Sequence, residues 1–278
     1  MSKDNYMADY LPAPITKNEN QRLEAVKRTG AMYLDQDELY DVYCYLAKEI
    51  TGCPVSWTGL IDSENQYCLA SDGFPEETSK KIPRKQTFCQ YALDKTEPLI
   101  IQNMKTDLTF KNHPLVKEGI VKFYAAFPIV TSDGYTLGTL CVSGDKEVEL
   151  TENQIKSLKS LSRKMAYQLE IQENFRNKSA ENLIQIINKI SQYVENLDIN
   201  NLKTILKFFS DHTIDDLEKK YLLNIKVIKK SAEKFEISDF GNKLKSELSL
   251  EKGILKRVKN LSNNENDLDN LFSEIRDN

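Results

Sequence analysis

The sequence predicts an α+β fold, in which helices cover an antiparallel sheet, followed by an all-α C-terminal region. Short runs rich in aromatic and β-branched residues predict strands, and the segments around them repeat apolar residues every three or four positions, as amphipathic helices do. The regular alternation of strands and helices that a parallel sheet needs is absent from this sequence. Composition changes after residue 170, where glycine becomes rare and proline disappears.

This change divides the chain into three predicted parts. We expect a polar N-terminal segment over residues 1–18, an α+β domain over residues 19–172, and a helical region over residues 173–278 that consists of a linker helix and a bundle. At about 150 residues per domain, a chain of 278 residues accommodates two such folding units.

The first half of the α+β domain begins with two helices between residues 19 and 50, separated near Gly30. The second helix is expected to end at Gly52, which suits a left-handed C-terminal cap, with Pro54 directly beyond it. Residues 55–62 and 66–71 follow as two strands joined by a polar turn, which predicts a hairpin. Residues 88–93 read as a short helix, residues 98–102 as a brief strand, and residues 106–119 as irregular.

The second half holds the clearest strand signal. Residues 122–130 and 135–142 are rich in aromatic and β-branched residues, and the intervening Asp133-Gly134 suits a hairpin turn that needs positive φ. Thr151 and Gln154 then form a capping-box pattern that predicts a helix start. An interrupted heptad pattern, typical of a coiled coil, continues to residue 197, and its polar gap over residues 172–179 predicts a break or hinge.

Further helices are expected in the C-terminal region, starting at Asp198, at Thr213 and at Ser249, where residues with N-capping side chains precede apolar-periodic segments. The apolar stripe of the second of these is expected to run from Leu217 to Ile228. Three lysines, at positions 226, 229 and 230, are interpreted as part of a solvated helix face.

Composition excludes several classes of function. The net charge of -4 leaves no basic field to hold a phosphate backbone, so we expect no nucleic-acid partner. No stretch of about 18 apolar residues occurs, and the N-terminus lacks the apolar run of a signal peptide, so we expect a cytoplasmic protein without a membrane span. The five cysteines lack CxxC spacing and paired histidines, so no metal site or disulfide framework is expected. Hydrolase, P-loop and kinase motifs are absent too, so the protein is expected not to be an enzyme.

Several ordered motifs resemble one known family. They are PITKNENQRL at residues 14–23, FCQYA at 88–92, PLIIQNMKTDLTF at 98–110, NHPLV at 112–116, KFYAAFP at 122–128 and GTLCV at 138–142. This series is similar to that of bacterial GAF domains over about 150 residues. The resemblance implies an antiparallel sheet with helices packed on it, and a pocket between the sheet and residues 103–122.

Members of that family bind cyclic nucleotides, bilins, haem or small organic effectors, and commonly dimerise through terminal helices. The resemblance therefore implies a class of ligand site without naming the ligand or any cofactor. Asn103 stands where the family often has Asp, and Tyr91 where it often has His. The cyclic-nucleotide signature, the bilin-attaching Cys beside His, and the cysteine spacing of the methionine sulfoxide reductases are all absent.

The candidate ligand-binding residues lie on or beside the expected pocket. Asp107 and His113 flank the covering segment, although Asp107 is equally suited to capping a loop. Aromatic residues of the predicted strands either pack in the core or line a cavity. Cys89 is interpreted first as a packed small residue and alternatively as a redox-sensitive thiol. The complete candidate set is Trp57, Cys89, Asn103, Asp107, Phe110, His113, Phe123, Tyr124 and Cys141, with no catalytic or metal-binding residue.

These features predict a sensor that binds a small-molecule effector and relays its binding through the C-terminal helices to a signalling protein partner, as a homodimer. Two alternatives stay open. The protein is then either a dimeric scaffold or adaptor without a ligand, or a redox switch that acts through Cys89 or Cys141. A filled pocket favours the scaffold, and a roomy cavity with convergent polar groups favours the sensor.

Overall fold

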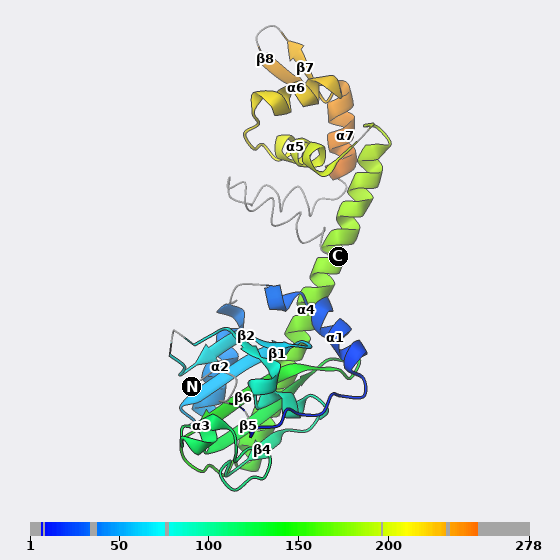
Figure 1. The fold of residues 1–278 in the computed structure, drawn as a ribbon. Coiled ribbons are helices and arrows are strands. Elements are labelled where there is room, and N and C mark those ends of the chain that lie inside the picture. The colour runs from blue at the N-terminus through cyan, green and yellow to red at the C-terminus, as the bar shows by residue number, and fades with distance from the viewer. Residues whose placement is uncertain are drawn as a thin grey trace. The chain divides into compact units, whose positions relative to one another are not determined.

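The computed structural model describes residues 7, 9–33, 38–75, 78–195, 197–231 and 234–249, and its fold is shown in Figure 1. The chain divides into two compact units, Met1–Glu173 and Asn174–Asn278. The first unit contains α1 (Glu19–Arg28), η2 (Ala31–Tyr33), α2 (Glu38–Thr51), β1 (Val55–Ile61), β2 (Asn65–Asp72), β3 (Lys81–Pro83), η3 (Arg84–Gln86), η4 (Cys89–Ala92), β4 (Leu99–Ile101), α3 (Pro114–Lys117), β5 (Phe123–Val130), β6 (Thr136–Gly144) and the start of α4 (Glu152–Ser191).

Within the described residues of this unit, six strands form one antiparallel sheet in the order β3-β2-β1-β6-β5-β4. Both predicted hairpins are confirmed as β1-β2 and β5-β6. The left-handed glycines predicted at their boundaries are present as well, since Gly52 ends α2 with a φ of 69° and Gly134 forms the β5-β6 turn with a φ of 88°. The predicted α+β class is therefore confirmed.

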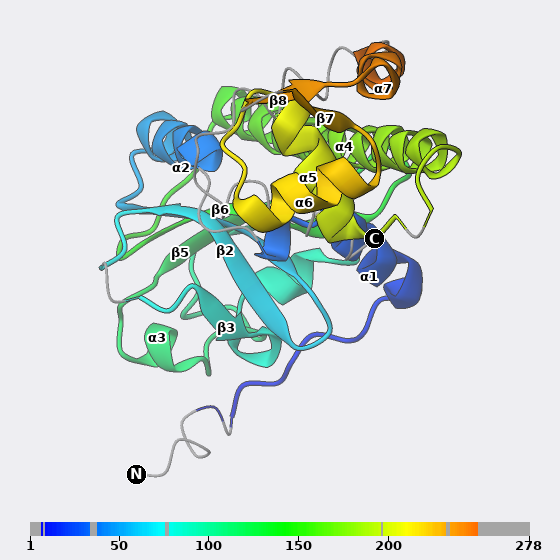
Figure 2. The ribbon, with the colours of Figure 1, turned by 90° about the horizontal axis from the view of Figure 1, so that it is seen from above.

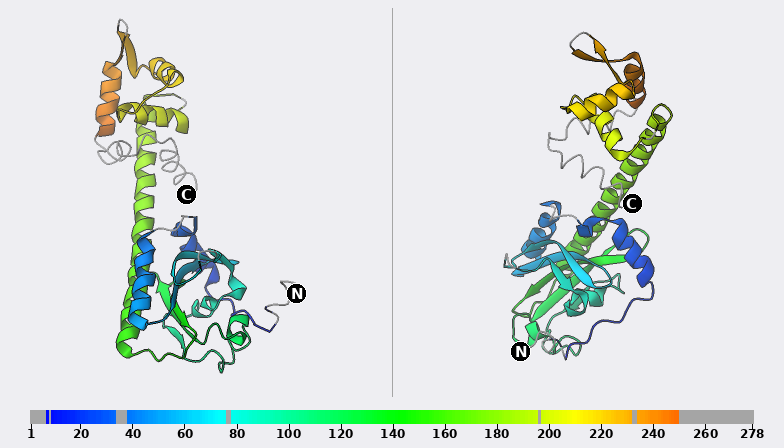
Figure 3. Two further views of the ribbon diagram at one scale, coloured as in Figure 1. Left: turned by 90° about the vertical axis from the view of Figure 1, so that its left-hand side faces the viewer. Right: turned by 45° about the horizontal axis from the view of Figure 1, so that its top comes forward.

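Helices cover one face of this sheet. Figures 2 and 3 show α2 and the first part of α4 along that face, with α3 and the connecting loops on the opposite side. The core under the helices contains apolar residues of α1, α2 and α4 together with inward-facing residues of β5 and β6. Along β5 the side chains alternate, so that Phe123, Ala125 and Phe127 face the helices while Tyr124 and Ala126 face the loops.

The loop side of the sheet has a core of its own. Apolar side chains of β1, η4, α3, β5 and β6 pack there, and the group includes Trp57, Cys89, Phe110, Tyr124 and Cys141. β3, η3 and α3 are not predicted from the sequence, because elements of three or four residues carry no periodic signal.

The predicted start of α4 is confirmed. The Thr151 hydroxyl accepts a hydrogen bond from the Gln154 backbone N–H at 3.3 Å, and the Gln154 side chain accepts one from the Thr151 backbone N–H at 2.8 Å. The break predicted over residues 172–179 is wrong as a break in the helix, because α4 continues through this segment. This segment contains neither glycine nor proline, the residues that most disfavour a helix interior, so its polar sequence does not interrupt α4.

The second unit contains the end of α4 followed by α5 (Ile199–Phe209), α6 (Asp216–Asn224), β7 (Ile228–Ser231), β8 (Lys234–Ile237) and α7 (Asp239–Ser249). Its core gathers Ile190, Leu202, Leu206, Leu222 and Leu244, among other apolar residues. The start predicted at Asp198 is confirmed, since its carboxylate accepts a hydrogen bond from the Asn201 N–H at 2.7 Å.

Two predictions for this unit need correction. The helix expected from Thr213 begins at Asp216, because Asp215 and Glu218 form the capping box instead. The region is mostly helical but not wholly so, because α6 ends at Asn224, and β7 and β8 pair as antiparallel strands. Lys226 adopts a positive φ of 62°, which ends the helical conformation. The helix predicted to start at Ser249 lies outside the described residues.

Candidate functional site

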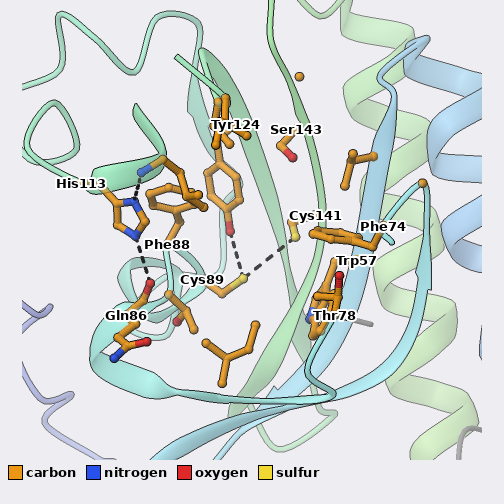
Figure 4. Close-up of a pocket in the computed structure, with 18 of the residues that line it drawn as sticks. Trp57, Phe74, Thr78, Gln86, Phe88, Cys89, His113, Tyr124, Cys141 and Ser143 are labelled. Atoms are coloured by element: carbon orange, nitrogen blue, oxygen red, sulfur yellow. Dashed lines mark hydrogen bonds between the residues drawn. The ribbon is translucent and has the colours of Figure 1, made fainter. Parts of the chain in front are cut away.

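A cavity of about 540 Å³ opens on the loop side of the sheet. Its walls come from β1, β5, β6, η4, the loop that follows β2 and the segment around α3, and Figure 4 shows them together. Most of the described lining residues are apolar or aromatic, including Trp57, Phe74, Ile82, Phe88, Leu115, Val121 and Tyr124. This size and lining are typical of sites for small organic molecules.

The charges around the cavity favour an uncharged guest. Among the described residues that line it none is lysine or arginine, whereas Asp145 is present. His113 also lines it, but burial lowers the pKa of its imidazole, despite a hydrogen bond to the Gln86 carbonyl that opposes this effect. The ring therefore stays neutral at neutral pH, and the described lining residues offer no fixed cation to an anionic ligand.

His113 has a structural part in this wall. Its Nδ1 accepts the Leu115 backbone N–H at 3.2 Å, which caps α3, and its Nε2 lies 3.1 Å from the Gln86 carbonyl oxygen. Since Nδ1 is the acceptor, Nε2 carries the proton and donates to that carbonyl. The imidazole thus ties α3 to η3 and is no free base (Figure 4).

Two buried polar atoms beside the cavity lack a hydrogen-bond partner among the described residues. These are Nε1 of Trp57, whose residue is 5% exposed, and Oε1 of Gln66, whose residue is 2% exposed. A buried polar group without a partner costs about 1 to 3 kcal/mol. A ligand that offers a hydrogen-bond acceptor to Trp57 Nε1 and a donor to Gln66 Oε1 would supply the missing partners.

A cysteine pair lies in the same wall. Cys89 of η4 and Cys141 of β6 bring their Sγ atoms to 3.9 Å, and the Tyr124 hydroxyl donates to Cys89 Sγ at 3.1 Å. The Gln66 amide donates to the same sulfur at 3.3 Å. The hydrogen bond with Cys141 lowers the pKa of Cys89 against the effect of burial, and Thr139, Tyr124 and Gln66 lower it further.

The N-terminal segment packs over this side of the domain. Tyr10 is buried, donates its hydroxyl to the Thr87 carbonyl at 3.1 Å and meets the His113 ring edge-on at 4.7 Å between centroids. The Ala13 N–H donates to the Gln90 side chain at 2.9 Å. This part of the polar N-terminal segment therefore supports the wall that η4 and α3 form.

A family model described as GAF domain matches residues 34–170. These residues form a GAF domain. A search of curated proteins gives a cyclic di-GMP phosphodiesterase of Pseudomonas aeruginosa, 28% identical over 153 residues, which are 54% of this chain and 25% of that protein. The chain thus matches a quarter of the length of this relative.

Solved structures with a similar fold include other GAF domains. The GAF domain of PixJ from Thermosynechococcus elongatus is 14% identical with a TM-score of 0.43, and the match covers 60% of this chain and 96% of that one. The GAF-B domain of DevS from Mycobacterium smegmatis is 15% identical with a TM-score of 0.41, covering 52% of this chain and 99% of that one.

Five of the nine candidate residues line the cavity of the GAF domain. They come from β1, η4, the N-terminus of α3, β5 and β6, and they are Trp57, Cys89, His113, Tyr124 and Cys141. The other four candidates do not line it. Phe123 is fully buried against the helices, because neighbouring residues of a strand face opposite sides and Tyr124 occupies the cavity side.

The remaining three candidates have structural contacts instead. Asp107 accepts the backbone N–H groups of Thr109 and Phe110, which is the loop-capping alternative. Asn103 donates a hydrogen bond to Glu147. Phe110 lies behind the wall, with its ring 5.8 Å from Phe88 in an edge contact.

Sequence reasoning missed the residues that complete the cavity, notably Gln66, Phe74, Phe88 and Ser143. Phe88 belongs to the FCQYA motif, and Ser143 lies two residues after Cys141 on β6, so that both side chains face the cavity. Gln66 and Phe74 had no local signal, because they reach the cavity through the β1-β2 pairing and the loop after it.

Proposed function

We propose that the GAF domain is a sensor that binds an uncharged, largely apolar small molecule in the cavity around Trp57 and Tyr124. The observation that carries the proposal is a roomy cavity with aromatic walls in which the Trp57 indole N–H and the Gln66 carbonyl lack partners among the described residues. The effector class is therefore a flat molecule that offers a hydrogen-bond acceptor to Trp57 and a donor to Gln66.

An anionic effector does not fit this proposal, because no lysine or arginine is among the described lining residues. The Pseudomonas relative is named as a phosphodiesterase of cyclic di-GMP, which is a dianion. Phosphate recognition normally uses arginine, lysine or a cluster of backbone N–H groups. We therefore propose neither binding nor hydrolysis of cyclic di-GMP for this chain, and we propose no catalytic step.

Ligand binding in the cavity can affect α4 because neighbouring residues of one strand face opposite sides of the sheet. In β1, Trp57 lines the cavity, and the next residue, Thr58, faces the helices, where its hydroxyl oxygen lies 3.5 Å from Sδ of Met165 in α4. In β6, Cys141 lines the cavity and Val142 belongs to the core under the helices. A guest that shifts either strand changes the packing of α4, and the coupling needs only different affinities for two arrangements, typically about 1 to 3 kcal/mol.

We further propose that the protein acts as a homodimer and that its C-terminal unit binds a signalling partner. Apolar side chains on the outer face of α2 support self-association, since Val42 is 51% and Tyr45 is 54% exposed. Tyr167 of α4 is 64% exposed as well. Analytical ultracentrifugation of wild type and of a Val42→Glu/Tyr45→Glu variant tests this point, with a dimer expected only for wild type.

The cavity proposal is tested with a matched pair of fluorescent probes. N-phenyl-1-naphthylamine is uncharged, and 1-anilinonaphthalene-8-sulfonate has the same aromatic skeleton with one added negative charge. We expect the uncharged probe to bind the full chain and raise its melting temperature, and the sulfonate to bind at least tenfold more weakly, which corresponds to about 1.4 kcal/mol.

A cavity variant and a matched control complete the test. Phe88→Ala removes an aromatic wall and should weaken binding of the uncharged probe, whereas Asn103→Ala, a change outside the cavity, should not. Equal affinity for both probes would contradict the charge argument. No binding of either probe would favour the ligand-free scaffold.

In the described part of the chain, no helix combines the length and apolar character that a membrane crossing requires. The cytoplasmic location stays a prediction.

A further inference from the structure

Two thiols from distant parts of the sequence meet in the cavity wall. Cys89 lies in η4 and Cys141 in the middle of β6, and their Sγ atoms are 3.9 Å apart. A disulfide bond has an S–S length of about 2.05 Å, so the two sulfurs already touch and need to approach by about 2 Å. Both cysteines are free thiols in this structure.

The surroundings make the two sulfurs unequal. Cys89 Sγ accepts hydrogen bonds from the Tyr124 hydroxyl and the Gln66 amide, and it also shares a hydrogen bond with Cys141 Sγ. The hydrogen bond with Cys141 and these two donors stabilise a thiolate at Cys89. The hydrogen bond with Cys89 and burial both raise the pKa of Cys141, so Cys141 stays protonated. One sulfur is thus prepared as a nucleophile, and the other is a resolving thiol beside it.

A small reagent reaches both sulfurs through the cavity. Cys89 is 5% and Cys141 7% exposed, and both line the cavity, whose rim includes the exposed side chains of Phe74 and Ile120. Cys44 provides the internal contrast, since it is fully buried under the helices and burial raises the pKa of its thiol to about 12.

We propose that Cys89 and Cys141 form a redox-active dithiol that a hydroperoxide oxidises to an intrachain disulfide. The Cys89 thiolate attacks one peroxide oxygen, the O–O bond breaks, and Cys89 becomes a sulfenic acid while hydroxide leaves and takes up a proton. The Cys141 sulfur then attacks the Cys89 sulfur, its S–O bond breaks, and the released hydroxide takes the Cys141 proton as water. Two thiols and one hydrogen peroxide give one disulfide and two waters.

The new bond changes the cavity directly. It joins η4 to β6 across the wall and replaces the Cys89 thiolate, which accepts from the Tyr124 hydroxyl and the Gln66 amide, by a disulfide sulfur, which is a weaker acceptor. Oxidation would therefore alter the same wall that an effector contacts. The dithiol does not depend on the existence of that effector.

The experiment treats the reduced full chain with hydrogen peroxide, denatures it, alkylates it with N-ethylmaleimide and measures the intact mass. Wild type should lose two of its five alkylatable thiols, and peptide mapping should give one Cys89–Cys141 cross-link. Cys44→Ser is the matched control and should form the same cross-link. Cys141→Ser should instead accumulate a Cys89 sulfenic acid that dimedone traps.

Tyr124→Phe is the variant that keeps all five thiols. Loss of one hydrogen bond to the thiolate should slow disulfide formation at neutral pH by about tenfold, with the same final cross-link. Five alkylated thiols in wild type after excess peroxide would overturn the proposal. A cross-link that joins other cysteines or two chains would overturn it too, as would an unchanged rate in Tyr124→Phe.

Discussion

Replacement of Glu19 by glutamine measures how strongly a buried charged cluster stabilises the first unit. The Arg22 side chain is fully buried and donates to both carboxylate oxygens of Glu19, at 2.8 and 2.9 Å, and to the Ile61 carbonyl at 2.7 Å. Arg84 also donates to Glu19. The cluster joins α1 to β1 and η3, and glutamine keeps the shape of the side chain but removes its charge.

The pKa of Glu19 gives the magnitude. Burial raises this pKa, but hydrogen bonds from Arg22 and Arg84 outweigh burial and lower it from 4.5 to about 2. Each pKa unit corresponds to about 1.36 kcal/mol, so the lowering corresponds to about 3 kcal/mol. The Glu19 side chain is 12% exposed, so solvent screening reduces the expected loss for Glu19→Gln to about 2 kcal/mol at pH 7.

Urea unfolding of wild type and variant across pH is the assay. Because the folded-state pKa is the lower one, the charge of Glu19 stabilises the fold above about pH 4.5, and this stabilisation is lost as pH falls toward 2. The difference between the two proteins should therefore shrink over that window. Glu24→Gln, in an exposed pair with Lys27 on the same helix, should change stability by less than about 0.5 kcal/mol. A difference for Glu19→Gln that is equally small, or independent of pH, would refute this reasoning.

Three other substitutions test separate parts of the fold. Thr151→Ala removes the N-cap of α4 and should lower the free energy of unfolding by about 1 kcal/mol in urea titration, and a neutral result would contradict the capping role. Phe123→Ala empties a fully buried site under the helices and should cost about 3 to 5 kcal/mol, while the folded variant binds N-phenyl-1-naphthylamine like wild type. His113→Asn should flatten the pH dependence of stability. Burial lowers the pKa of His113 below 6.5 in the folded protein, so the unfolded state binds more protons, and the folded wild type loses stability as pH drops below 6.5. An unchanged slope would place the pH dependence elsewhere.

The strands and helices of the first unit could be predicted because their signals are local. Asp133-Gly134, Gly52 and the Thr151 capping box fix the turn and helix ends through the backbone conformations and side-chain hydrogen bonds that these residues favour. The β7-β8 hairpin lacks such a signal. Its strands have four residues each and are rich in lysine, and Lys226 takes a left-handed conformation that nothing in the sequence marks.

The candidate residues that lie on predicted strands could be placed in the site from the sequence. Trp57, Tyr124 and Cys141 lie on strands whose loop-facing sides form the wall, whereas Phe123 could not share that side with its neighbour Tyr124. The contact between Cys89 and Cys141 joins residues that lie 52 positions apart in the sequence. Only the packing of η4 against β6 brings them together, so sequence spacing carries no sign of the pair.

Trp57 offers the most direct measurement of the central claim, because it is the only tryptophan in the sequence and it lines the cavity. N-phenyl-1-naphthylamine absorbs where tryptophan emits, so a probe bound beside Trp57 quenches its emission by energy transfer. Titration of the full chain should quench this emission at one probe per chain, and the Phe88→Ala variant should need more probe. Probe binding that leaves the Trp57 emission unchanged would contradict a binding site in this cavity.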